Sequence, residues 1–139
     1  MMRQLAVIDT NVLVSALLSK REDAATVQVF RAIFEERLIP LYHQQILAEY
    51  EEVLRRPKFH LPEEAVRSVM SAIMQFGIEV DPSPTGEILI DMDDLIFFEV
   101  AMEKRKDGAR LVTGNQRHFP ITDLIVSPSE MMDILNGRP

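Results

Sequence analysis

The chain has 139 residues, 47% of them hydrophobic, and its 22 acidic and 15 basic side chains give a net charge of −7. This length suits one domain over residues 1–139, and no apolar stretch reaches the roughly 18 residues that a membrane-spanning helix needs. The absence of cysteine excludes disulfides, thiolate catalysis and cysteine-bound zinc. Because no signal peptide is apparent either, we expect a cytoplasmic protein.

The first half of the chain alternates short apolar runs with amphipathic segments. Four apolar residues end in Asp9, which predicts a buried strand with an acid at its C-terminal end. Pro40 weakens the pairing of the strand predicted around it, and Pro57 stops a helix. In order, the pattern predicts a strand over 5–8, helices over 11–18 and 24–36, a strand over 38–42, and helices over 44–55 and 63–76.

The second half continues the alternation after a turn-forming Pro-Ser-Pro-Thr-Gly segment at 82–86. A short apolar run at 88–90 then leads into a group of three aspartates. In order, the pattern predicts a strand over 78–80, a helix over 95–106, strands over 110–113 and 125–127, and a helix from 128 to about 135. Strands that alternate with helices predict an α/β domain with a mainly parallel sheet.

The first candidate site residues are acids at the end of a predicted strand and on a predicted helix. Asp9 follows the first strand, and in open α/β sheets ligands bind at that edge. A buried acid there needs a cation opposite it. On the helix predicted over 44–55, Glu49 and Glu51 lie on the two edges of the apolar stripe, and the pattern does not choose between them. An ordinary solvated acidic helix face remains the alternative for both.

Later in the chain, Asp91, Asp93 and Asp94 precede a helix. Capping explains one or two acids at a helix start, but three in four residues repel one another, so at least one is a candidate ligand. Asp94 is the best placed, immediately before the apolar helical run. Thr113 and Asn115 end a later strand as Asp9 ends the first, and Asn115 is either a ligand or a turn residue.

Two or three carboxylates at a sheet edge suit Mg²⁺ or Mn²⁺, which prefer oxygen ligands. Such an ion polarises a phosphoryl oxygen and generates hydroxide near neutral pH, so phosphodiesters can be hydrolysed without a nucleophilic side chain. Competing signatures are missing: the sequence has neither a Gly-rich phosphate loop nor a Gly-x-Ser-x-Gly elbow. His43, His60 and His118 are not spaced as a zinc motif, and we assign them to the surface or to loops.

Taken together, these motifs resemble the PIN-domain family, particularly the compact VapC-type ribonucleases of bacterial and archaeal toxin–antitoxin pairs. The similarity runs in order along essentially the whole chain. Residues 7–16 resemble the family's first motif, and Glu49, within residues 46–59, matches its helical glutamate. Residues 91–101 resemble the third motif, with Asp94 as its aspartate, and residues 110–115 resemble the fourth. Residues 127–132 are similar to the family's closing segment.

The resemblance implies a three-layer α/β/α PIN-like fold with a mainly parallel sheet of four to five strands. It also implies Mg²⁺- or Mn²⁺-dependent cleavage of RNA, a small antitoxin as partner, and a homodimer. Asp9, Glu49 and Asp94 would hold the metal, and Asn115 would assist them. The implied supporting residues are Thr10, Asn11, Asp91 and Thr113, and the candidates for contacting the RNA backbone are Arg55, Arg56, Lys58 and Arg117.

The fourth motif departs from the family pattern. The subfamily usually has aspartate where Asn115 stands, and related toxins often carry another acid where this chain has His118. Without that acid, the site has three carboxylates and holds one metal well, unless Asp123 or Asp93 replaces the missing carboxylate. The alternative function is a catalytically weakened PIN domain that serves as an RNA- or protein-binding scaffold. A phosphatase or receiver-like domain also has an aspartate at a strand end, but the expected lysine after a late strand is missing.

Overall fold

The computed structural model describes residues 3–120 and 122–138, and its centre is a parallel sheet of five strands in the order β3–β2–β1–β4–β5. All four neighbouring pairs are parallel, which confirms the predicted α/β class. The strands are β1 (Gln4–Ile8), β2 (Leu38–Tyr42), β3 (Ile78–Glu79), β4 (Arg110–Val112) and β5 (Ile125–Val126).

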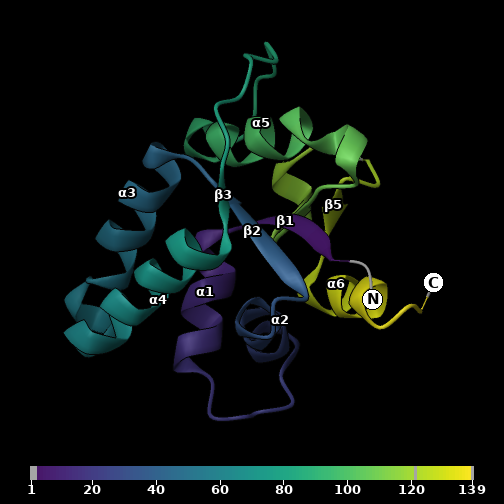
Figure 1. Ribbon diagram of the computed structural model, residues 1–139. Helices are drawn as coiled ribbons and strands as arrows, with labels where there is room; N and C mark the ends of the chain where they lie inside the picture. Colours follow the sequence, from purple (N-terminus) through teal and green to yellow (C-terminus); the bar gives the residue numbers. More distant parts are fainter. Residues whose placement is uncertain (1–2, 121, 139) are drawn as a thin grey trace.

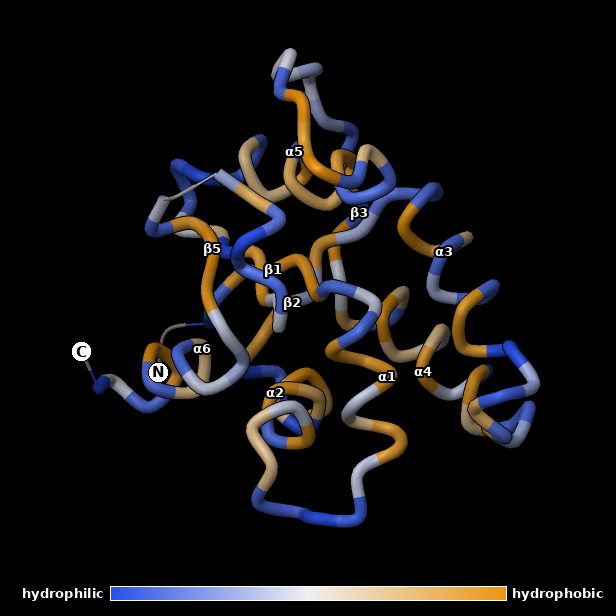
Figure 2. The backbone as a smooth tube through the Cα atoms, turned by 180° about the vertical axis from the view of Figure 1, so that it is seen from behind, coloured by the Kyte–Doolittle hydropathy of each residue, from blue (hydrophilic) through white to orange (hydrophobic). Residues whose placement is uncertain are grey.

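Within the described residues, six helices cover the two faces of this sheet. Figure 1 shows α5 on one side and α1, α2 and α6 on the other, and the same arrangement is seen from behind in Figure 2. Helix α5 packs against β1, β2 and β4, while α2 and α4 pack against β2. The result is the three-layer α/β/α arrangement. The helices are α1 (Thr10–Leu18), α2 (Ala25–Phe34), α3 (Gln44–Leu54), α4 (Glu63–Phe76), α5 (Leu95–Glu103) and α6 (Pro128–Leu135).

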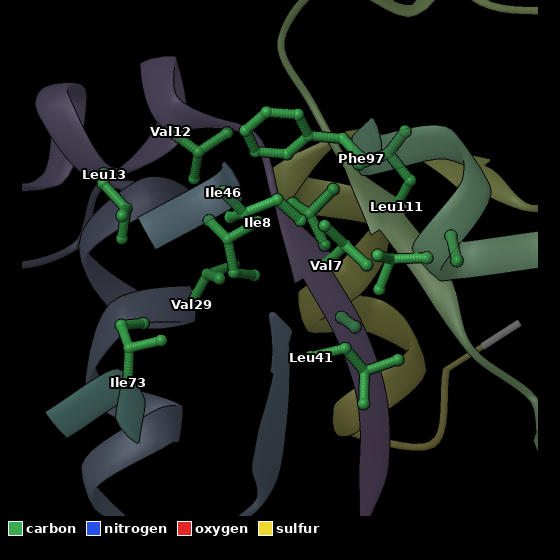
Figure 3. Close-up of a cluster of buried hydrophobic side chains, with 14 of the residues drawn as sticks. Val7, Ile8, Val12, Leu13, Val29, Leu41, Ile46, Ile73, Phe97 and Leu111 are labelled. Atoms are coloured by element: carbon green, nitrogen blue, oxygen red, sulfur yellow. The ribbon is translucent and has the colours of Figure 1, made fainter. Parts of the chain in front are cut away.

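The core lies where these helices meet the sheet. Val7 and Ile8 of the central strand are almost fully buried because both faces of β1 are covered. Figure 3 shows Val12, Ile46 and Phe97 near Ile8, so α1, α3 and α5 converge on the C-terminal end of β1. This packing brings three separate helices to the strand end that carries Asp9.

Helix α5 ends three residues earlier than the sequence pattern predicts. The apolar run stops at Glu103, and Arg105–Asp107 forms a separate 3₁₀ turn. Gly108 ends that turn with φ of +83°, a conformation that glycine adopts without steric cost. The described part of the chain contains no helix long and apolar enough to cross a membrane.

Pro40 lies in an internal strand, although the sequence predicts that it weakens pairing. The N–H of Gln4 donates to the carbonyl oxygen of Arg37, so in a parallel ladder the amide position of Pro40 faces away from β1. On that side β3 begins only opposite Leu41. The missing N–H of Pro40 therefore falls where the neighbouring strand has not yet started.

Gly77, just before β3, allows the chain to pass close to β2. A Cβ atom at this position would overlap the carbonyl oxygens of Ile73 and Pro40. We expect Gly77→Ala to lower the free energy of unfolding by about 2 kcal/mol, because both obstructing atoms belong to the backbone. Urea unfolding measures this change. Gly114→Ala is the matched control, since a Cβ there meets no atom within 4 Å; an equal loss in both variants would contradict the prediction.

Candidate active site

The candidate site lies at the topological switch point of the sheet. The chain leaves β1 for β2 on one side and later returns to β4 on the other, so the C-terminal ends of β1 and β4 flank a crevice of the kind where ligands bind. Asp9 follows β1 and is 7% exposed. The hydroxyl of the fully buried Thr113, which follows β4, donates to Asp9 Oδ2 at 2.6 Å. This bond orients the Asp9 carboxylate.

Glu49 reaches the same edge from α3. The hydroxyl of Thr10, the first residue of α1, donates to Glu49 Oε2. Glu49 is half-buried, whereas Glu51 is exposed and lies 3.4 Å from Arg55. The structure thus places Glu49 at the site and Glu51 on the outer surface, a choice that the helical pattern leaves open.

Tyr50 positions α3 against β1, a role that the sequence analysis misses because it counts this residue only as part of the apolar stripe. Its side chain is 1% exposed, and its hydroxyl donates to the carbonyl oxygen of Ile8. The ring also packs against Phe97 of α5, with 6.1 Å between centroids. A buried tyrosine hydroxyl needs a partner, and that requirement is the signal that points to this contact.

The three aspartates before α5 have different surroundings. Asp91 accepts a hydrogen bond from the N–H of Asp93 at 3.0 Å and so caps the 3₁₀ turn Met92–Asp94. Asp94 makes no capping bond, and its side chain is 18% exposed. Asp91 therefore performs the ordinary capping role, while Asp94 is available to the site.

Burial raises the pKa of Asp94 to about 6, and the nearby charges of Asp9, Asp91 and Glu49 act in the same direction. His118 opposes this rise, and its Nδ1 lies 3.8 Å from Asp94 Oδ2. His118 is half-buried on the 3₁₀ turn Gln116–His118, so it approaches the site more closely than a surface assignment suggests.

Burial also raises the pKa of Glu49, and Asp9, Asp93 and Asp91 add to this effect, while the hydrogen bond from Thr10 lowers the pKa. The carboxylates of three segments are thus close enough to destabilise one another's charge. Within the described residues, the ion pairs of Lys and Arg do not include Asp9, Glu49 or Asp94.

Four other predicted residues lie at or beyond the margin of this cluster. Asn115 is exposed, and its backbone N–H donates to the Thr113 hydroxyl at 3.0 Å. Among the described residues, the side chains of Asn115 and Asn11 make no hydrogen bond, so the loop-tying contact implied for Asn11 is not seen. Asp123 lines a different cavity, at the β5 edge, whereas Asp93 lines one together with Glu49.

The four cations proposed for RNA contacts differ in their surroundings. Arg55 pairs with Glu63 of α4 at 2.9 Å, and Arg56 pairs with an acid one turn earlier on α3 at 2.8 Å. The ammonium of Lys58 lies over the ring of the neighbouring phenylalanine. Arg117 is exposed and has no ion pair with any described residue. Because exposed ion pairs are weak, the pairings of Arg55 and Arg56 do not prevent RNA contacts. Arg117 can contact RNA without breaking an ion pair with a described residue.

The other two histidines lie outside the helices and strands, in agreement with the predicted surface or loop positions. His43 caps α3 through Nδ1, which accepts from the N–H of Gln45 at 3.1 Å. His60 is exposed after a 3₁₀ turn.

The donor set of the site consists of carboxylate oxygens, which suit a hard divalent cation. Within residues 3–120 and 122–138, however, no three acidic or histidine side chains form a ready-made metal-binding group. Thr10 and Thr113 each engage one carboxylate oxygen of Glu49 and Asp9, respectively. The chemistry and the location of these side chains thus suit a divalent cation, although the described residues do not form a ready-made group around one.

Comparison with known proteins agrees with this geometry. The model of the PIN domain family matches residues 5–117, a range that runs from within β1 to beyond β4 and includes all four predicted catalytic positions. Among curated proteins, the search finds no significant match.

Proposed function

Because the chain belongs to the PIN-domain family, whose members are generally nucleases, we propose that it is a Mg²⁺- or Mn²⁺-dependent endoribonuclease. The observation that supports the proposal is that Asp9, Glu49 and Asp94 come from three separate segments to the switch point of the sheet, close enough that the charge of Asp9 raises the pKa values of the other two carboxyls. Their mutual repulsion is a cost that a divalent cation would remove.

Each residue has a distinct part in this proposal. Asp9, Glu49 and Asp94 hold the cation, which supplies Lewis-acid activation of the phosphodiester and of water when bound. Thr113 holds Asp9 in its rotamer through the 2.6 Å bond, and Thr10 does the same for Glu49. Such hydrogen bonds to ligating carboxylates keep the ligand set oriented.

The proposed context is a type II toxin–antitoxin pair in the cytoplasm. The order of the motifs along the chain supports this subfamily, in which a small antitoxin silences the ribonuclease and the nuclease forms a homodimer. The test is genetic: the neighbouring open reading frame should encode a small DNA-binding protein whose co-expression relieves growth arrest. A chain that arrests growth equally with and without that neighbour would contradict the toxin assignment.

Cleavage of single-stranded RNA with Mn²⁺ or Mg²⁺, and its loss in EDTA, tests the enzymatic proposal. We expect Glu49→Gln to lower the rate at least about a hundredfold, because it removes one charged ligand. Glu52→Gln is the matched control, since this exposed residue lies on the same helix and pairs with Arg56. Cleavage that persists in EDTA, or full activity of Glu49→Gln, would overturn the assignment.

The second candidate function is a weakened PIN domain that serves as an RNA- or protein-binding scaffold. The exposed Asn115 in place of an acid favours it, because a neutral amide is a poorer ligand than a carboxylate for a hard cation. A scaffold would bind RNA or a partner protein equally well with Mn²⁺ and with EDTA, and would cleave in neither.

A further inference from the structure

A projecting loop, residues 81–91, lies beside the carboxylate cluster and contains an apolar stretch at residues 88–90. Residues 81–91 connect β3 to α5 and extend beyond α5 at the top of Figure 1, and the hydropathy colouring shows an apolar stretch on the corresponding loop in Figure 2. The loop is held at its base, where the N–H and hydroxyl of Thr85 donate to Glu99 of α5 at 2.7 and 3.0 Å. These two hydrogen bonds give the loop a defined position on α5.

Ile88 and Ile90 are 87% and 79% exposed, the highest values among the large hydrophobic side chains of the described residues. They flank Leu89, which is 7% exposed and belongs to the core. Leu89 packs into the core between them, and its burial leaves both neighbours facing solvent. Packing thus accounts for Leu89 but not for the apolar character of the other two.

The two isoleucines line a cavity of about 210 Å³ whose other walls are the 3₁₀ turn after β4 and Phe119. That turn contributes Arg117 and His118. Since His118 lies 3.8 Å from the Asp94 carboxylate, the cavity adjoins the candidate metal site.

The chemistry of this cavity matches a single nucleotide. Its isoleucines can cover one face of a base, and the free guanidinium of Arg117 can bind a phosphate. The volume is below the roughly 300 Å³ of sites for drug-sized ligands, so one base fits better than a larger group. A base can expose its face in this way only when it is unpaired.

We propose that this cavity holds one unpaired nucleotide of the RNA strand next to the scissile phosphate, with its base against Ile88 and Ile90 and its phosphate on Arg117. This inference rests on the proposed ribonuclease function and adds a place for one nucleotide of the single-stranded substrate, on Ile88, Ile90 and Arg117.

Methyl NMR of the isoleucine-labelled protein in EDTA tests the base contact directly. We expect nucleoside 5′-monophosphates to shift the methyl signals of Ile88 and Ile90, and ribose 5-phosphate to leave them in place. Arg117→Gln should weaken nucleotide binding about threefold or more, since it removes a charge-assisted contact. Equal shifts with ribose 5-phosphate, or no shift at these two methyls, would overturn the proposal.

A second measurement uses an RNA oligonucleotide in EDTA, so that no cleavage occurs. We expect the double variant Ile88→Ser/Ile90→Ser to bind single-stranded RNA about fivefold more weakly and to leave duplex affinity unchanged. Leu18→Ser, at a 45% exposed site on α1, is the matched control. Unchanged single-strand affinity of the double variant, or binding of a protein partner through these isoleucines without nucleotide shifts, would overturn the inference.

The two proposals fail in different ways. Nucleotide shifts at Ile88 and Ile90 without Mn²⁺-dependent cleavage would count against the ribonuclease function alone. Mn²⁺-dependent cleavage with the same KM in the wild type and in the double serine variant would count against the nucleotide cavity alone.

Discussion

Replacing Asp9 by asparagine is expected to abolish Mn²⁺-dependent RNA cleavage and, at the same time, to leave the Tm in EDTA unchanged or raised. The loss should reach about 10³-fold, because a central ligand of the proposed cation is neutralised. The fold should tolerate the change, since the amide oxygen can still accept the hydrogen bond from Thr113 and the repulsion with Glu49 and Asp94 disappears.

Thermal unfolding with and without Mn²⁺ separates a metal ligand from a structural residue. A metal at 100 times its Kd stabilises the folded state by about 2.7 kcal/mol, and Asp9→Asn should remove most of that gain. Asp23→Asn is the control, because Asp23 lies on the surface and pairs with Arg21. If Asp9→Asn kept full activity, or if its Tm fell sharply in EDTA, the assignment of Asp9 as ligand would be wrong.

The second large effect concerns Asp94 and the pH dependence of stability in EDTA. Its pKa is about 6 in the folded chain against an ordinary 3.8. Between these values the folded state holds a proton that the unfolded state releases, so the contribution of Asp94 to stability is present below about pH 4 and is lost as pH rises through about 6. Glu49, whose pKa is also raised, acts in the same direction.

The variant Asp94→Asn isolates this contribution. At pH 7 in EDTA it should be more stable than the wild type by about 1 kcal/mol, a figure reduced for the partial solvent screening of this half-buried group. At pH 4 the two proteins should differ little. Glu63 and Glu130 have lowered pKa values, so the stability that they contribute to the fold is lost as pH falls. For this reason only the difference in free energy of unfolding between variant and wild type is informative. Urea unfolding across this range measures it, and a variant less stable than the wild type at pH 7 would contradict the prediction.

Much of the fold follows from local patterns. Apolar runs ending in polar residues predicted all five strands within a few residues, and Ser127 and Glu130 form the capping box that begins α6. Where an observed boundary differs from the predicted one, as at the end of α5, a local feature such as the turn that ends at Gly108 sets the boundary. The PIN family itself also follows from sequence, because its motifs occur in order along the chain.

Only part of the candidate site can be predicted from local sequence patterns. Asp9 is recognisable because an acid directly after a buried strand lies at a sheet edge whatever the topology. The choice between Glu49 and Glu51 depends on which side of α3 faces β1, and the Tyr50 hydroxyl bond to Ile8 decides that. The engagement of Arg55 by Glu63 links two helices and is likewise invisible in a local pattern.

The sequence by itself determined the alternation of strands and helices, the family, and the acid at the end of β1, because these depend on residues close together in the chain. Only the tertiary structure decided that the Tyr50 hydroxyl joins α3 to β1 and that Ile88 and Ile90 face outward beside Arg117. These outcomes depend on contacts between segments distant in the chain, which are set by how the helices pack on the sheet.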